Sequence, residues 1–272
     1  MTDTTTQAPP QPAQPQMDQF RVDLLNRIGS ADDPGPLKAS VFGPEGVGKT
    51  VWCCQAKNCF LIDVEKGRRS IANHPDLMAQ MKNRILKVRN FNDMEETVWA
   101  IREGDIQERI QAPIDTIIID TMTTLVAGTT DQVMEKVAAE NNNRSIHYPS
   151  QAERVLVNSL IRKMTVAFTD LDQNLIIVSH QDWVKDEDSG RMMIGPMLSP
   201  KIAQTVRSIV DFQGRMTAED LGDGHYVRWL QAHPTKDTLA KCRIGGVPVK
   251  FDASALDINK LIKLHQSVLA AA

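Results

Sequence analysis

The sequence lacks an apolar run long enough to span a bilayer, and its polar N-terminus lacks the hydrophobic core of a signal peptide. It also lacks an excess of positive charge, because 31 lysines and arginines face 34 aspartates and glutamates, for a net charge of −3. No global positive field therefore favours a nucleic-acid partner, although a local basic groove could still bind one. We expect a soluble, intracellular protein with no membrane partner.

Cysteine is scarce, with four in 272 residues. Three of them, Cys53, Cys54 and Cys59, lie close together, whereas Cys242 is remote in sequence. Adjacent Cys53 and Cys54 would point to different sides of a helix, which does not suit a metal site. We expect reduced thiols that pack as small buried hydrophobic side chains.

The length fits one α/β domain with embellishments. Residues 1–16 are mostly Thr, Gln, Pro and Ala, a composition typical of a disordered tail. Residues 17–28 have helical spacing, and glycine and proline then interrupt the pattern, so 17–36 is predicted as a short helix and linker. The main domain is expected to cover residues 37–272 and to end in an amphipathic helix.

Predicted strands and helices alternate along this domain, which indicates a mainly parallel sheet with helices on both faces. Ligands of such sheets bind at the carboxyl ends of the strands. Asn92 is expected to cap the helix at 91–101, and residues 183–194 resemble a hairpin. The expected strands are 38–42, 59–65, 85–88, 114–120, 174–179, 209–216 and 226–230, with a strand-like segment at 239–246; the expected helices are 51–56, 91–101, 121–140, 150–170, 199–206 and 254–269.

The segment Gly43–Thr50 matches the phosphate-binding pattern of Gly, four residues, Gly, Lys and Ser or Thr. It also lies between a predicted strand and a predicted helix, as that pattern requires. Glycines let backbone N–H groups fold around an anion, and the helix adds its positive end. Lys49 would reach the β- and γ-phosphates, and Thr50 would hold Mg²⁺. The alternative is a simple glycine-rich turn. The expected nucleotide-binding residues are Gly43, Pro44, Glu45, Gly46, Val47, Gly48, Lys49, Thr50 and Val51.

Asp120 ends the clearest predicted strand, residues 114–120. At the carboxyl end of that strand its carboxylate can hold a Mg²⁺-bound water beside Thr50. The sequence therefore predicts a site for ATP and Mg²⁺, with Thr50 and Asp120 as the metal-binding residues.

Five short motifs follow one another along the chain: Gly43–Thr50, Asp63-Val64-Glu65, Ile117–Asp120, Ser179-His180-Gln181 and Lys241-Cys242-Arg243. In this order they resemble the motifs of RecA-like ATPases, and within them the small phage-encoded AAA-type nucleotide-binding proteins that include the Sak-type single-strand annealing ATPases. The likeness covers roughly residues 37–250, so the fold that it implies is a RecA-like P-loop NTPase core.

The resemblance implies catalytic roles beside Lys49. Glu65 would activate the attacking water; the alternative is an exposed acid that pairs with Arg68 or Arg69. His180 or Gln181 would sense the γ-phosphate, although a histidine that merely caps the strand would look the same.

Lys241 and Arg243 resemble a finger that reaches the nucleotide of a neighbouring subunit, which is worth ~10³–10⁵ in rate in related enzymes. This implies self-association with the nucleotide at a subunit interface. The alternative is a solvated pair on an edge strand.

The resemblance also implies that two loops, at about 128–150 and 182–200, bind single-stranded DNA through charge and stacking surface. The acidic residues 186–188 at the tip of the second loop would repel phosphates, which leaves its flanks. The candidate DNA-binding residues are Lys136, Arg144, Tyr148, Trp183, Lys185 and Arg191.

The preferred hypothesis is an oligomeric ATPase of phage DNA recombination or single-strand annealing in the cytoplasm of the bacterial host. Its partners would be single-stranded DNA and an annealing or single-strand-binding protein. The alternative is a nucleotide-dependent switch or assembly factor without a direct DNA role. A small-molecule kinase ranks last, because no lid-like cluster of arginines is evident.

Overall fold

The computed structural model describes residues 34–141, 145–186, 190–222 and 224–267. The residues from Pro34 onward form one compact unit. The predicted tail at 1–16, the predicted helix at 17–28 and Arg144 lie outside the described residues.

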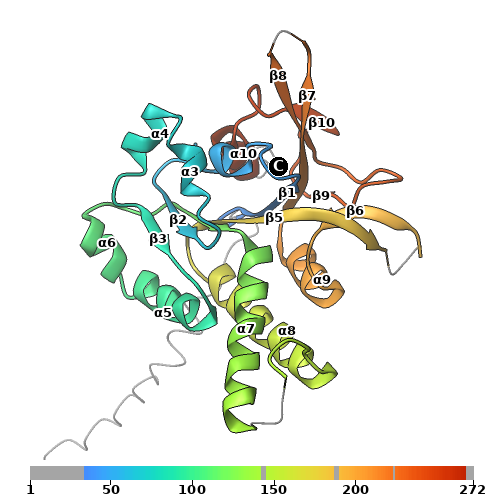
Figure 1. Cartoon of the computed structure of the whole chain (residues 1–272). Coiled ribbons are helices and arrows are strands. Elements are labelled where there is room, and N and C mark those ends of the chain that lie inside the picture. Colours follow the sequence, from blue (N-terminus) through green and yellow to red (C-terminus); the bar gives the residue numbers. More distant parts are fainter. Residues whose placement is uncertain (1–33, 142–144, 187–189, 223, 268–272) are drawn as a thin grey trace, which may run out of the picture. The chain divides into compact units, whose positions relative to one another are not determined.

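A sheet with the strand order β10-β8-β7-β1-β5-β4-β2-β3 forms the centre of this unit (Figure 1). Strands β1 to β5 and β7 are parallel where they pair, and the strands at the C-terminal side of the sheet are antiparallel. The prediction of an α/β fold with a mainly parallel sheet is therefore confirmed. The strands are β1 (Lys38–Gly43), β2 (Cys59–Asp63), β3 (Ile85–Lys87), β4 (Thr116–Asp120), β5 (Asn174–Lys185), β6 (Met192–Pro196), β7 (Phe212–Asp220), β8 (Tyr226–Gln231), β9 (Lys241–Cys242) and β10 (Lys250–Asp252).

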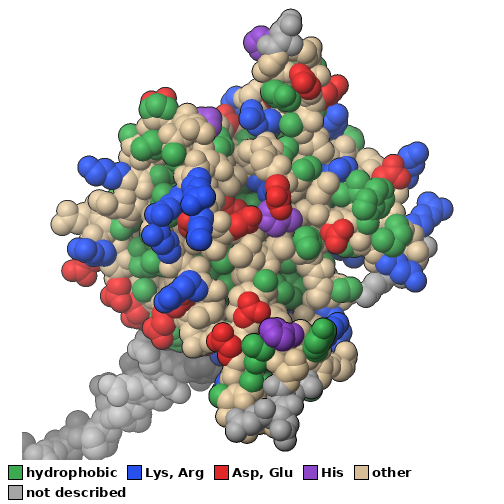
Figure 2. Space-filling model, viewed as in Figure 1, with side chains coloured by type: hydrophobic (Ala, Val, Ile, Leu, Met, Phe, Trp, Pro, Cys, Tyr) green, Lys and Arg blue, Asp and Glu red, His purple; other side chains and the backbone are tan. Residues whose placement is uncertain are grey.

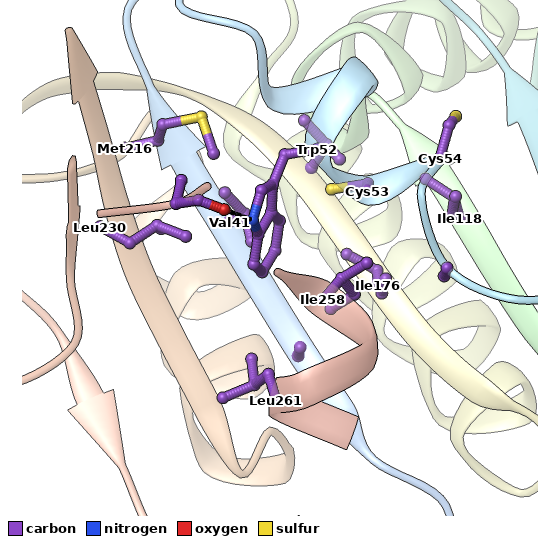
Figure 3. Packing of buried hydrophobic residues seen from close by; sticks show 14 of the residues in the cluster. Val41, Trp52, Cys53, Cys54, Ile118, Ile176, Met216, Leu230, Ile258 and Leu261 are labelled. Carbon is purple, nitrogen blue, oxygen red and sulfur yellow. Dashed lines mark hydrogen bonds between the residues drawn. The ribbon is translucent and has the colours of Figure 1, made fainter. Parts of the chain in front are cut away.

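One face of the sheet is covered by α2 (Lys49–Cys53), α3 (Arg68–Ile71), α4 (Pro75–Gln80) and α10 (Ile258–Ser267). Trp52 lies at the centre of this layer, packed among Val41, Leu230 and Ile258 (Figure 3). Its indole N–H donates a 3.0 Å hydrogen bond to the carbonyl of Ala253, just after β10. The short helix after the phosphate-type loop is therefore fixed to a segment about two hundred residues away.

The other face is covered by α5 (Phe91–Arg102), α7 (Met122–Glu140), α8 (Gln151–Thr169) and α9 (Pro200–Ile209). Strand β4 divides its isoleucines between the two faces, because successive side chains of a strand point to opposite sides. Ile118 packs with Trp52, whereas Ile117 and Ile119 pack with these helices. Helix α6 (Asp105–Ile110) has no fully buried residue.

Several predicted boundaries were wrong for local reasons. Asn90, not Asn92, caps α5, and its side chain accepts the N–H of Asp93. Strand β7 begins at Phe212 rather than at residue 209, because α9 continues to Ile209. Helix α2 begins at Lys49, within the glycine-rich motif itself.

The C-terminal helix begins at Ile258 rather than at Ser254. Residues 250–252 pair with β8, and the carboxylate of Asp252 then accepts the backbone N–H of Ser254 and holds a turn. The predicted hairpin is present as β5 and β6, and its residues 187–189 lie outside the described part of the chain.

Cys53, Cys54 and Cys59 are buried free thiols, as predicted. Within the described residues, none of the helices combines the length and apolar character that crossing a membrane requires.

Candidate nucleotide site

The loop between β1 and α2 has a backbone shape that its glycines make possible. Gly46 and Gly48 have φ angles of 72° and 99°, in the left-handed region that favours glycine. At Gly43 a Cβ atom would lie 2.3 Å from the carbonyl oxygen of Met216, so no side chain fits there. The loop thus lies tightly against the sheet and leads directly into the N-terminus of α2.

Lys49 extends across this loop. Its ammonium group donates hydrogen bonds to the carbonyls of Gly43 at 2.9 Å and Pro44 at 2.7 Å. Burial lowers the pKa of this amine, and the charges of Asp120 and Glu65 oppose that effect. A buried cation is therefore held directly above the loop, where a bound phosphate would meet it.

The predicted metal-binding residues are in contact. The hydroxyl of Thr50 donates a 2.7 Å hydrogen bond to a carboxylate oxygen of Asp120. Asp120 is 1% exposed, and burial raises the pKa of its carboxyl group to about 6. The charges of Glu65 and Asp63 raise this pKa further, whereas the bond from Thr50 lowers it.

A second carboxylate, that of Asp63, lies opposite Asp120 in the pairing of β2 with β4. One of its oxygens accepts the N–H of Gly67 at 2.7 Å, and the other is buried and has no hydrogen-bond partner among the described residues. Gly67 lies so close that a Cβ atom there would be 2.4 Å from the Asp120 carboxylate. The turn after β2 is therefore held against the acidic pair.

These residues fit a Mg²⁺ ion that is shared with a nucleotide. Mg²⁺ is usually bound by one or two carboxylates together with substrate phosphates and water. Thr50 and Asp120 supply such a partial set, and the unpartnered oxygen of Asp63 lies beside it. Within the described residues there is no group of three or more His, Cys, Asp or Glu that could hold a metal ion without other ligands.

Glu65, the predicted base, is bound by His180. The Nε2 atom of His180 lies 3.0 Å from both carboxylate oxygens, and the hydroxyl of Thr121 donates to one of them at 2.8 Å. The observed partner is thus His180, rather than Arg68 or Arg69. The contact arises because His180 lies opposite Gly43 in the pairing of β1 with β5.

The two candidate sensors point in different directions. His180 lines the cleft beside the loop, whereas the side-chain oxygen of Gln181 accepts a 2.9 Å hydrogen bond from Arg215 on β7. Burial lowers the pKa of Arg215. Of the two residues, the structure brings only His180 to the site.

A cleft of about 440 Å³ lies over the loop and collects these groups. Figure 2 shows acidic side chains and a histidine next to a cluster of basic side chains near the middle of this face. Residues that the sequence did not indicate also line it, including Lys66, His74 and Arg228. Arg228 comes from β8 and donates to the carbonyl of Val47 at 3.0 Å. This contact is long-range, so no local sequence motif predicts it.

The predicted finger residues lie elsewhere in their own chain. Lys241 and Cys242 pair with the first residues of β7, and β7 in turn begins beside the first residues of β1. The phosphate-type loop follows the other end of β1, so Lys241 lies at the opposite end of the sheet from the loop. The Lys241 ammonium donates to the carbonyls of Arg207, Ser208 and Val210 and caps the end of α9. Arg243 lies 3.9 Å from Asp211. Their action on a neighbouring subunit stays a prediction.

The described candidates for DNA contact lie on the surface. Tyr148 and Trp183 are 78% and 58% exposed, and Lys136, Lys185 and Arg191 are also exposed. They come from three separate segments: α7, the stretch before α8, and the β5–β6 hairpin. DNA binding by these residues likewise stays a prediction.

A glycine-rich loop at the end of a parallel strand, a buried lysine above it and a hydroxyl bonded to an aspartate on a nearby strand define a P-loop nucleotide-binding site. The chain belongs to a family of AAA domains, whose model matches residues 35–244. The protein is therefore a nucleotide-binding protein of the ATPase type. The comparison with curated proteins found no match.

Proposed function

We propose that the protein is a Mg²⁺-dependent ATPase that binds single-stranded DNA and acts in phage recombination or strand annealing, in the cytoplasm of the host cell. The observation that supports ATP use most directly is the 2.7 Å contact between Thr50 and Asp120 beside the amine of Lys49. It joins helix α2, which follows the phosphate-type loop, to the end of β4.

Each side chain has a defined part in hydrolysis. Lys49 would bind the β- and γ-phosphates, and Thr50 with Asp120 would hold a Mg²⁺ ion, which would supply positive charge to the phosphates. Glu65 would orient a water and accept its proton as the water attacks the γ-phosphorus. The bond from that phosphorus to the β–γ bridging oxygen breaks in the same step, and ADP leaves. His180 and Thr121 both contact the Glu65 carboxylate and thereby fix its position in the site.

The DNA role is supported by surface chemistry and by the resemblance of the motifs. Exposed Tyr148 and Trp183 offer faces on which bases can stack, and Lys136, Lys185 and Arg191 offer positive charge for the backbone. Lys241 and Arg243 would complete the site of an adjacent subunit when the protein assembles on DNA. An annealing or single-strand-binding protein is the expected partner in that assembly.

The test is the ATPase rate and the oligomer mass, each measured with and without single-stranded DNA. We expect DNA to raise both, and the binding to weaken steeply with salt because phosphate contacts release counterions. Trp183→Ala should reduce this stimulation. Trp99→Ala removes a similarly exposed tryptophan from α5 and serves as the control. An ATPase that DNA leaves unchanged would favour a nucleotide-dependent switch or assembly factor.

A further inference from the structure

The side chain of Arg228 faces the phosphate-type loop because of its register in β8. Leu230, two residues along the strand, is fully buried in the core with Trp52. Side chains two apart on a strand share a face. Arg228 is therefore directed to the same side of the sheet as α2, but nearer the strand end that borders the loop.

Its contact with the loop is close and uses only part of the guanidinium group. The Nε–H donates to the carbonyl of Val47 at 3.0 Å, and a Cβ atom on Gly48 would lie 2.7 Å from the same nitrogen. Within the described residues, the two terminal nitrogens of Arg228 have no hydrogen-bond partner. A guanidinium anchored at Nε thus has its fork, the part suited to bidentate phosphate contacts, available.

Arg228 also lies where two cavities meet. The 440 Å³ cleft adjoins a cavity of about 220 Å³, since both are lined by Gly48, Val51, His74 and Arg228. The two cavities differ in their other walls. Glu65, Asp120 and His180 line only the first, whereas Tyr226, Asp252 and Gln55 line only the second.

This arrangement gives a bound nucleotide its direction. The hydrolytic groups Glu65 and Asp120 mark the γ-phosphate end of the first cleft, so the nucleoside extends toward the second cavity. The phosphates that cross the boundary between the cavities are then the α- and β-phosphates. Of the four described residues that line both cavities, Arg228 is the one with a permanent positive charge.

The charges in the cleft make such a cation necessary. Three carboxylates line it, Glu45, Glu65 and Asp120, and they oppose binding of a polyphosphate. Lys49 lies over the loop, where it serves the β- and γ-phosphates, and Lys66 directly follows Glu65 in sequence. Of the lysines and arginines that line the cleft among the described residues, Arg228 is the one that also lines the second cavity, so it is placed to reach the α-phosphate as well.

We propose that Arg228 binds the α- and β-phosphates of the nucleotide from within the same subunit. The inference rests on the nucleotide binding described under the proposed function and adds a phosphate-binding residue from the β7–β8 hairpin. It makes the hairpin, and not only the loop, part of the nucleotide site. It also makes binding of the nucleoside diphosphate independent of any finger from a neighbouring subunit.

The experiment is calorimetric titration with ADP and with ATP, both with Mg²⁺, on the full chain. Arg228→Ala should weaken both nucleotides by a similar factor of about 10–100, the range for a hydrogen bond to a charged group. Arg228→Gln can still donate to Val47 but lacks the charge, and should be equally weak. Arg228→Lys keeps the charge and should recover part of the affinity.

Lys250→Ala is the matched control. Lys250 is a cation of the adjacent strand β10, and its ammonium group lies over the ring of Trp229. Trp229 follows Arg228 in β8 and therefore points to the opposite face of the sheet. Lys250→Ala should bind both nucleotides as the unaltered protein does. If Arg228→Gln binds ADP as tightly as the unaltered protein, Arg228 only supports the loop and the inference is overturned. If the unaltered protein binds neither nucleotide, the proposed function itself fails.

Discussion

Thr50 and Asp120, 70 residues apart in sequence, are joined by a 2.7 Å hydrogen bond in which the hydroxyl donates to a buried carboxylate. The carboxylate is 1% exposed and lies near the carboxylates of Glu65 and Asp63. A carboxylate buried in this way destabilises the folded protein when it is charged, because the hydrogen bond from Thr50 and the charge of Lys49 offset its lost solvation only in part. Function and stability therefore conflict at Asp120.

Replacing Asp120 by Asn should stabilise the metal-free protein at neutral pH. The amide keeps an acceptor for Thr50 and removes the buried charge. The folded protein binds the carboxyl proton more tightly than the unfolded chain, since the pKa is raised from 3.8 to about 6. The free energy of unfolding therefore falls by up to about 3 kcal/mol as the pH rises from 3.8 through about 6.

Urea unfolding in a metal chelator, from pH 4 to 8, checks this expectation. The difference between Asp120→Asn and the unaltered protein should grow up to about pH 6 and then level off. Asp76→Asn, an exposed aspartate at the start of α4, is the control and should show no such trend. Equal unfolding curves for both proteins at pH 8 would contradict the expected cost of the buried charge.

Lys49→Ala should abolish nucleotide binding and leave the fold intact. The substitution removes the ammonium group that spans the loop, together with two hydrogen bonds to loop carbonyls. Fluorescence titration with a labelled ATP analogue measures the binding, and circular dichroism checks the fold. Lys57→Ala, at an exposed position just beyond α2, should bind the analogue normally. Tight binding by Lys49→Ala would exclude the predicted role.

Glu65→Gln should bind ATP as tightly as the unaltered protein and hydrolyse it at least 10²-fold more slowly, about the contribution of a general base. Glutamine preserves the size of the side chain and an acceptor for Thr121, but it cannot take the proton of the water. Single-turnover hydrolysis, together with an equilibrium titration, separates the two effects. Glu96→Gln, at an exposed position on α5, is the control. Normal turnover in Glu65→Gln would require another base.

Arg243→Ala should lose ATPase activity and regain part of it when mixed with Glu65→Gln. In a mixed assembly, an intact finger from one protein can meet an intact base in the other. Lys241→Ala should behave differently, because its amine caps α9. We expect it to lower stability by about 1 kcal/mol as well, which thermal unfolding would detect. An Arg243→Ala protein that stays inactive after mixing would indicate a role within one subunit.

Trp52→Ala should cost about 3–5 kcal/mol of stability, the range for a large aromatic residue in a core. It removes a side chain that is 3% exposed, together with the hydrogen bond to Ala253. Trp99→Ala, at 52% exposure, should cost less than about 1 kcal/mol. Urea denaturation of the two variants compares them directly, and similar losses would contradict the described core.

The contact between Thr50 and Asp120 could be predicted from the sequence, because the loop follows a local glycine pattern and Asp120 ends an apolar strand. The sequence left His180 and Gln181 unresolved, since their difference depends on which face of β5 each side chain occupies. It missed Arg228 entirely. That residue reaches the loop only through the register of β7 with β8, and its partner, Val47, is 181 residues away.

Helix ends show the same limit on a smaller scale. Asn92 fits a capping pattern as well as Asn90 does, and only the backbone conformation at Asn90 decides between them. The Lys241 amine could equally well have been solvated, because nothing in its neighbourhood in sequence shows that the end of α9 lies beside it.

The hydrogen bond between Trp52 and Ala253 indicates how far the chain must extend for the domain to fold. The family match stops at residue 244, before β10 and α10. Yet Phe251, Ile258 and Leu261 are buried against the layer that contains Trp52, directly behind the loop. A truncation at the limit of family similarity would remove one wall of that layer and expose apolar surface under the nucleotide site. The segment that folds as a unit therefore extends beyond residue 244, where the family match ends.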